Sequence, residues 1–310
     1  MTRGTPKAEI TAARAHISET RRPTVAALEA ILQTEHRVLD HGFVRVIDYM
    51  GDDAAVVQAA RVSYGRGTKK ISEDRALIRY LMRHWHSTPF EMCEIKLHAK
   101  LPIFVARQWV RHRTANINEY SARYSILDRE FYTPAPAQLA SQATTNRQGR
   151  GAVLDDEQAA HVLHLLRDDA ERSYATYRRL LNDPDDPDHD ADRTGLTREL
   201  ARIGLSLSTY TQWYWKTDLH NLFGFLRLRA DPHAQFEIRA YAELIWDIVR
   251  QWVPASCEAF EDYRMNAVSL SAAEADVVRQ ALTGTAMTRP RNISPREWSE
   301  FSARFGIIAT

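Results

Sequence analysis

The alternation and clustering of apolar residues predict several strands. Residues 43–49 are rich in β-branched and aromatic side chains, which favours a strand. Over residues 94–101, apolar positions alternate with charged residues and a histidine in the two-residue period of a half-exposed strand, which Pro102 ends. An aromatic run over residues 209–215 predicts another strand, and residues 130–133 favour a short one.

Helical periods occur between and after these strands. Leu77, Leu81 and Trp85 recur every four residues in a helix that starts at Ser72. A longer helix begins at Asp231-Pro232. Its apolar face consists of Ile238, Tyr241, Ile245, Ile248 and Trp252. Further helices are expected from Asp52 or Asp53 to Ala60, from Asp218 to Leu226, and over residues 25–32, 103–109, 156–181, 196–205 and 256–263.

Several short signals predict caps and loops. Thr88–Glu91 is a capping box with a proline in the first turn, and it predicts that a short helix restarts there. Residues 138–151 are polar and small and should be mobile, and residues 183–192 form an acidic loop with two prolines. Two more capping boxes, Ser271–Glu274 and Ser294–Glu297, predict an ordered helical tail.

The order of these elements favours an α+β fold. It contains neither a strand-helix-strand series with a G-x-G-x-x-G fingerprint nor a P-loop, so any bound nucleotide is held by another device. We expect a small, mainly antiparallel sheet wrapped by helices in a single domain over residues 37–264. Residues 1–36 are expected to be a peripheral N-terminal extension, and residues 265–310 a C-terminal helical extension.

Composition limits the classes of partner. The 310 residues are 44% hydrophobic, enough for a large core, and the formal charge of +1 argues against nucleic-acid binding through bulk charge. Cys93 and Cys257 have no metal-type spacing, which fits a reducing compartment. The sequence contains no apolar run of membrane-spanning length and no signal-peptide core. A cytoplasmic protein without a membrane or nucleic-acid partner is therefore expected.

A dense group of charged residues lies between residues 111 and 124. Three arginines and a histidine surround Glu119 and Ser121, without a helical or strand period. Arginine recognises phosphate and carboxylate through paired, charge-assisted hydrogen bonds, so this stretch predicts a site for a phosphorylated ligand. The alternative is a solvated loop held by local ion pairs.

Other candidate chemistries are weaker. The histidine pairs at 84 and 86 and at 161 and 164 lack nearby cysteine or carboxylate ligands, so no metal site is expected. Neither cysteine has the partner of a catalytic thiol. A nucleophilic Ser121 would need a base and an oxyanion site, whereas its neighbours are arginines. We therefore interpret Ser121 as a phosphate ligand.

The same residues carry a resemblance. Arg111-His112-Arg113, seven residues and then Ser121 resemble the R-H-R-x7-S signature of the flavin-dependent thymidylate synthase (ThyX) family. Segments in the family's order support it over about residues 40–264. These segments are residues 60–63, 86–91, 102–109 and 226–235.

The resemblance implies a homotetrameric methyltransferase with active sites at subunit interfaces. Such an enzyme converts dUMP to dTMP, takes its carbon from 5,10-methylenetetrahydrofolate, and uses FAD reduced by NADPH as the hydride source. Arg229 matches the residue credited with stabilising charge on the uracil ring, for which a permanently protonated guanidinium is suited. Because flavin supplies the hydride, the lack of a cysteine nucleophile agrees with this family and not with the cysteine-dependent synthase.

The resemblance also implies positions for the ligands. The dUMP positions are Gln108, Trp109, Val110, Arg111, Glu119, Tyr120, Ser121, Ala122, Arg123, Arg202 and Arg229. The FAD positions are Ser63, Thr88, Arg111, His112, Arg113, Glu119, Asp218, Leu219, His220 and Gly224. His86 matches a residue near the flavin ring and the folate pocket.

This chain departs from the family pattern mainly on the FAD side. Asn116 stands where many members have serine, Asp218 and His220 where asparagine and arginine are frequent, and Gly224 where a side chain often makes a contact. Asp218 could instead serve only as a helix cap. Two competing hypotheses are a non-catalytic nucleotide- or RNA-binding module and a flavoprotein of the same fold that has lost methyl transfer.

Overall fold

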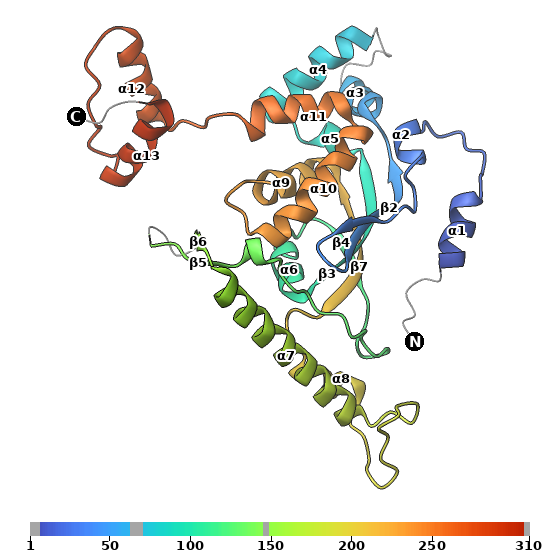
Figure 1. Cartoon of the computed structure of the whole chain (residues 1–310). Coiled ribbons are helices and arrows are strands. Elements are labelled where there is room, and N and C mark those ends of the chain that lie inside the picture. The colour runs from blue at the N-terminus through green and yellow to red at the C-terminus, as the bar shows by residue number, and fades with distance from the viewer. Residues whose placement is uncertain (1–6, 63–70, 145–148, 307–310) are drawn as a thin grey trace. The chain divides into compact units, whose positions relative to one another are not determined.

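The computed structural model describes residues 7–62, 71–144 and 149–306 (Figure 1). The chain divides into two units, Met1–Tyr263 and Arg264–Thr310. The first unit contains a mainly antiparallel sheet and most of the helices, so the expected α+β class is confirmed. Residues 7–36 belong to this unit.

The main sheet has five strands in the order β1-β2-β3-β7-β4, and every neighbouring pair is antiparallel. The strands are β1 (His36–Val38), β2 (Gly42–Met50), β3 (Glu94–Pro102), β7 (Tyr210–Asp218) and β4 (Asn116–Glu119). The strands expected over residues 43–49, 94–101 and 209–215 are confirmed. β4 is a correction, because part of the charged stretch pairs with β7 and so satisfies backbone groups that a loop would leave to water.

One face of the sheet forms the core beneath three helices. Ile95, Leu97 and Ala99 of β3 are fully buried on or beside this face. The helices α6 (Ile103–Trp109), α9 (Leu219–Arg229) and α10 (Phe236–Trp252) pack against the sheet, as the arrangement in Figure 1 shows for α9 and α10. The five apolar residues predicted on α10 are all buried, which confirms its periodic face.

A hydrogen-bonded arginine and histidine lie on the other face of the sheet. The alternation places His98 on the exposed face of β3, but it is only 6% exposed because Arg45 and Tyr214 pack against it. Arg45 Nε donates to His98 Nδ1 at 2.9 Å, so the hydrogen on Nε2 points to Gln212 Oε1, also at 2.9 Å. The imidazole thus connects β2, β3 and β7.

Further helices, helical turns and one separate strand pair occur between residues 7 and 265. They are α1 (Lys7–Ala15), α2 (Ala26–Glu29), α3 (Asp53–Val62), α4 (Ile71–Arg83), α5 (Thr88–Glu91), α7 (Asp156–Leu181), α8 (Arg198–Ala201), α11 (Pro254–Phe260), the 3-10 turns Pro136–Gln138 and Arg202–Gly204, and the π-turn Glu261–Met265. Strands β5 (Ala140–Gln142) and β6 (Arg150–Val153) pair separately. Two parts of the segment expected to be mobile, residues 140–142 and 150–151, therefore lie in paired strands.

Several local predictions are wrong. Ser87, not Thr88, is the cap residue of α5, and it makes no side-chain cap bond. α4 ends at Arg83, and Trp85 lies beyond it at φ 62°, 68% exposed. α10 begins at Phe236, because the Asp231 carboxylate instead accepts the His233 backbone N–H in a local turn. Residues 130–133 contribute only a bridge at Phe131.

The second unit contains α12 (Ala272–Leu282) and α13 (Pro295–Phe305). Both predicted capping boxes are present, at Ser271 and Ser294, with the reciprocal glutamate bonds. Val277, Ile293 and Phe301 are buried and form the apolar centre of this unit. Both helices of this unit therefore begin at the caps that the sequence predicted.

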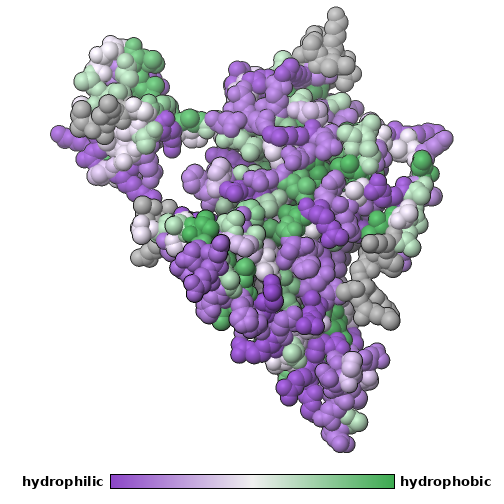
Figure 2. All heavy atoms as spheres, in the orientation of Figure 1, coloured by the Kyte–Doolittle hydropathy of each residue, from purple (hydrophilic) through white to green (hydrophobic). Residues whose placement is uncertain are grey.

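On the side drawn in Figure 2, hydrophilic residues dominate the surface, and apolar residues gather near α10. Among the residues that the structure describes, none of the helices is both long and apolar enough to cross a membrane.

Candidate functional site

A buried tryptophan anchors the start of the charged stretch. Trp109, the last residue of α6, is fully buried. Its ring meets Trp213 and Trp215 edge-on, at centroid distances of 5.6 and 5.2 Å, and stacks on Phe225 at 4.8 Å. Val110, half-buried, closes the helix, so the backbone that leads into Arg111 has a fixed direction. Any contact of Trp109 with a ligand would have to come from its main chain.

Strand pairing holds the middle of the stretch. Glu119 pairs with Trp213 of β7, and its carboxylate accepts the Thr211 hydroxyl at 2.7 Å. Thr217 Oγ1 donates to the Thr114 carbonyl at 3.1 Å. Asn116, the departure from the family pattern, is exposed and pairs with Lys216. β7 therefore supports the middle of the stretch, from Thr114 to Glu119.

The tertiary fold brings Arg229 to the R-H-R motif. Arg229 Nε donates to His112 Nε2 at 3.0 Å, and Arg229 Nη2 donates to the Gln108 carbonyl at 3.3 Å. Burial, with Arg229 beside it, lowers the pKa of His112 to about 4. His112 is thus neutral near pH 7 and accepts a hydrogen bond, so it orients the guanidinium without neutralising its charge.

Burial also acts on Arg229 itself. It lowers the pKa of the guanidinium, and the nearby positive charge of Arg111 adds to the effect. A guanidinium starts from so high a pKa that it stays protonated. Arg229 is therefore a half-buried cation that would stabilise negative charge developing on a ligand.

Acid should destabilise the fold through His98 and His112, whose pKa values fall furthest below that of a free imidazole. Burial, followed by the charge of Arg45, lowers the pKa of His98 to about 4, as for His112. Unfolding raises both towards 6.5, so the unfolded chain binds more protons between pH 6.5 and 4, and stability falls as pH drops through that window. For the buried His98 the loss is on the order of 3 kcal/mol.

Urea unfolding at pH 7.5, 6 and 5 measures this dependence. The His98→Asn variant should be less stable at pH 7.5 but lose less on acidification, because it lacks the titrating ring. An equal slope for both proteins would contradict the assignment.

A second group of site candidates gathers around α8. Arg123 Nε lies 3.3 Å from a carboxylate oxygen of Glu199, and Arg202 Nε donates to the Glu199 carbonyl at 3.3 Å. The Arg123 backbone N–H donates to Ser121 Oγ at 3.3 Å, which leaves the hydroxyl hydrogen available to a ligand. Ala122 is buried, and the Tyr120 hydroxyl donates to the Ile126 carbonyl.

Apart from those of the charged stretch, the described FAD candidates lie on or next to α5 and α9, which pack together through Phe90 and Phe223. Thr88, His220 and Gly224 are exposed, and a side chain added at Gly224 would meet nothing within 4 Å. Leu219 is fully buried, so only its main chain is available. His86 is exposed and its ring stacks on Tyr80 at 5.9 Å, whereas Ser63 lies outside the described residues.

Asp218 serves as the cap of α9. Its carboxylate accepts the Asn221 backbone N–H at 2.9 Å and the Asn221 side-chain amide at 2.7 Å. Both oxygens are therefore engaged within the protein, which agrees with the cap alternative.

The cysteines are unsuited to nucleophilic attack. Cys93 and Cys257 are free and buried. Burial raises the pKa of both thiols, to about 12 for Cys93. Since the thiolate is the reactive species, neither residue can serve as the nucleophile of a cysteine-dependent synthase. In the described part of the chain, no group of three or more metal-ligand side chains is placed to hold an ion.

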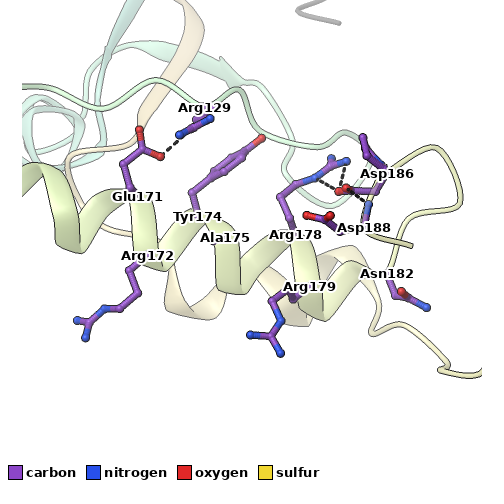
Figure 3. Close-up of a pocket in the computed structure, with 11 residues that line it drawn as sticks. Arg129, Glu171, Arg172, Tyr174, Ala175, Arg178, Arg179, Asn182, Asp186 and Asp188 are labelled. Carbon is purple, nitrogen blue, oxygen red and sulfur yellow. Dashed lines mark hydrogen bonds and ion pairs between the residues drawn. The ribbon is translucent and has the colours of Figure 1, made fainter. Parts of the chain in front are cut away.

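A separate pocket of about 640 Å³ lies beside α7 and the acidic loop (Figure 3). Arg129 pairs with Glu171 and Arg178 with Asp186, each at 2.6 Å. The pocket's lining includes none of the residues proposed for dUMP or FAD. Arg129 thus ties the segment before α7 to the helix, Arg178 ties the helix to the loop after it, and we do not assign the pocket to the nucleotide site.

Sequence reasoning missed two partners of the candidate residues. Glu199 lies three residues before Arg202, a spacing that predicts a local ion pair, but its carboxylate instead contacts Arg123. Gln235, within the family-like segment after Arg229, accepts from the Gln108 side-chain amide. Its place in that segment is the feature of the sequence that could have indicated a role at the site.

The chain is similar to known proteins over most of its length. A family model described as thymidylate synthase complementing protein matches residues 45–255. The flavin-dependent thymidylate synthase of Gluconobacter oxydans is 62% identical over 298 residues, 96% of each chain. That of Ruegeria pomeroyi is 60% identical over 300 residues, 96% of this chain and 97% of the relative.

A solved structure is also similar. The UMP/dUMP methylase PolB from Streptomyces cacaoi, bound with 5-Br dUMP, is 31% identical, with a TM-score of 0.65. The match covers 73% of this chain and 97% of that one. With a family model matched over more than half of its length and relatives at about 60% identity, this chain belongs to the family of flavin-dependent thymidylate synthases.

Proposed function

We propose that this chain converts dUMP to dTMP, with 5,10-methylenetetrahydrofolate as the carbon donor and FAD, reduced by NADPH, as the hydride source. Family membership supports the reaction. The observation that carries it in this chain is Arg229, a cation held by a neutral histidine beside the R-H-R motif. The catalytic site belongs to the first unit.

Arg229 supplies what uracil chemistry needs. Uracil C5 is a weak nucleophile, and its attack on a one-carbon electrophile becomes easier when charge on the N3/O2/O4 system is stabilised. A fixed cation provides that stabilisation in the transition state. The hydrogen bonds to His112 and to the Gln108 carbonyl orient it before the substrate arrives.

The phosphate of dUMP fits the group around α8. Ser121 offers a hydroxyl hydrogen, and Arg123 and Arg202 offer guanidinium donors whose present partner is Glu199. These side chains are exposed or half-buried, so a phosphate dianion can compete for them. Arg111 lies close enough to Arg229 to lower the pKa of its guanidinium, which connects the two ends of the substrate site.

The described residues fit FAD. Arg113, Thr88 and His220 are exposed donors, and the open surface at Gly224 leaves room for a flat ligand beside α9. Arg111, His112 and Glu119 of the charged stretch would complete this set, and the His112 ring already packs against Phe225 of α9. His86 would lie towards the flavin and folate. When bound, reduced FAD supplies the hydride. Asp218 contributes by capping α9, because its carboxylate is already engaged.

A homotetramer with active sites at subunit interfaces accounts for the open surface around these residues. Arg111, Arg113, Glu119, Arg123 and Arg202 are all exposed in the single chain. Large apolar side chains near them are exposed too, including Tyr124 at 74% and Ile203 at 80%. A neighbouring copy would cover both sets. The buried free thiols are consistent with the proposed cytoplasmic location.

Purified protein tests the proposal directly. It should be a yellow tetramer whose flavin is bleached by NADPH and reoxidised when dUMP and methylenetetrahydrofolate are added, with dTMP as product. A colourless protein that FAD cannot reconstitute and that binds RNA would contradict it.

Ser121→Ala should chiefly weaken dUMP binding. Loss of a hydrogen bond to a charged phosphate corresponds to a rise of roughly tenfold to a hundredfold in the KM for dUMP, with kcat largely kept. Steady-state kinetics over a wide dUMP range separates the two constants. Complete loss of turnover at saturating dUMP would instead indicate a nucleophilic serine.

A further inference from the structure

A row of three side chains leads from the candidate site into the core. The Gln108 side-chain amide donates to Gln235 Oε1. Gln235 Nε2 in turn donates to Glu237 Oε2 at 2.8 Å. Glu237 is 5% exposed, whereas Gln108 is half-buried at the site, where its main-chain carbonyl accepts from Arg229. The row therefore connects a buried carboxylate to a residue beside the proposed catalytic cation.

The carboxylate at the buried end has a fixed environment. Glu237 Oε1 accepts the Tyr132 hydroxyl at 3.1 Å and lies 3.6 Å from the Arg150 guanidinium. Its other oxygen accepts from Gln235. An ionised carboxylate has no hydrogen to donate, so only the NH₂ end of Gln235 can face it.

This constraint passes along the row. With its NH₂ turned to Glu237, Gln235 presents its carbonyl to Gln108, and Gln108 must turn its own NH₂ towards Gln235. The side-chain carbonyl oxygen of Gln108 is then the amide atom that remains available to a ligand. The polarity of an otherwise reversible amide is thus set by a charge two residues away in the row.

We propose that Gln108 presents its carbonyl oxygen to the substrate and recognises an N–H or O–H donor of the nucleoside, with Gln235 and Glu237 as the positioning residues that set this polarity. The inference rests on the proposed function. Arg111, Arg123, Arg202 and Arg229 offer only donors, which suit the phosphate and ring carbonyls of dUMP. An acceptor among them suits the N3–H of uracil or the 3′-hydroxyl of the sugar.

Glu237→Gln should reverse the row. Tyr132 and Arg150 would hold the new carbonyl oxygen, so the new NH₂ would face Gln235 and turn both glutamines around. Gln108 would then present its side-chain NH₂ group to the N–H or O–H donor of the nucleoside, and no hydrogen bond could form. We expect dUMP to bind about tenfold to a hundredfold more weakly to the FAD-loaded protein.

A charge swap restores the polarity. The double variant combines Gln235→Glu with Glu237→Gln. Its new carboxylate at position 235 accepts from both neighbouring amides, so the side-chain carbonyl of Gln108 faces the ligand again. Both variants lose the charge beside Arg150, so that loss cannot account for a difference between them. The swap should bind dUMP within about threefold of the wild type. Glu243→Gln makes the same change at an exposed position of α10 and should have no effect.

Equilibrium dialysis with labelled dUMP gives the dissociation constants, and bleaching of the flavin by NADPH shows that each variant is folded and loaded. The proposed polarity would be overturned by unchanged dUMP affinity in Glu237→Gln. It would also be overturned if the charge-swap variant bound dUMP no more tightly than Glu237→Gln. A flavin-loaded wild type that does not bind dUMP would overturn the proposed function and this inference with it.

If Glu237→Gln does not fold, analogues test the wild type alone. N3-methyl-dUMP and 3′-deoxy-dUMP each lack one donor. At least one of them should bind about tenfold more weakly than dUMP, and full affinity for both would overturn the proposal.

Discussion

Replacing Arg229 with alanine should reduce dTMP formation by about 10² to 10³ while FAD remains bound. Arg229 is the cation that the fold places against His112 and the Gln108 carbonyl, and it contributes most when charge develops on the uracil ring. Its loss removes transition-state stabilisation, and kcat should fall more than dUMP affinity. Turnover measured at saturating dUMP, with the flavin spectrum recorded in parallel, tests this result.

Arg229→Lys is the matched control. It keeps a positive charge but not the two-sided donor geometry that reaches both His112 and Gln108. We expect activity between those of wild type and Arg229→Ala. Wild-type turnover in the alanine variant would remove Arg229 from the mechanism, and loss of FAD from it would show that the residue acts through the fold.

Trp109→Ala should destabilise the first unit by about 3 to 5 kcal/mol. The side chain is fully buried, and its ring contacts Trp213, Trp215 and Phe225 within one aromatic cluster. Removing it leaves a cavity where α6, α9 and the sheet meet, directly before the R-H-R motif. Urea unfolding followed by tryptophan fluorescence and circular dichroism measures the change.

Trp85→Ala provides the comparison, since the Trp85 side chain is 68% exposed. Its effect should stay within about 0.5 kcal/mol. If the two substitutions lowered the free energy of unfolding equally, the buried ring contacts of Trp109 would not be the source of its stabilising effect. Trp109→Phe should lose less than the alanine variant, because it keeps an aromatic ring in the cluster.

Local periodicity was sufficient for most elements of the fold. The alternation over residues 94–101, the β-branched run over 43–49 and the stripe on α10 each report a face that must be buried, so they predicted β3, β2 and α10. The tail caps at Ser271 and Ser294 were predictable because a capping box is closed by residues only three apart.

Elements that depend on distant partners were not predictable in the same way. β4 carries no strand pattern, because its four residues are exposed and it is held by backbone pairing with β7. His98 occupies a polar position in the alternation and is nevertheless buried, since Arg45 and Tyr214 cover it from neighbouring strands. Neither contact leaves a mark in the local sequence.

By itself, the sequence determined the family, through the spacing from Arg111 to Ser121, and most of the helices and strands, because these follow from residues close together in the chain. Only the tertiary structure decided how the candidate residues meet. Arg229 reaches His112 across 117 positions, and Glu237 sets the amide polarity of Gln108 through Gln235. Charge state and hydrogen-bond polarity depend on burial and on partners in space, and a linear pattern contains neither.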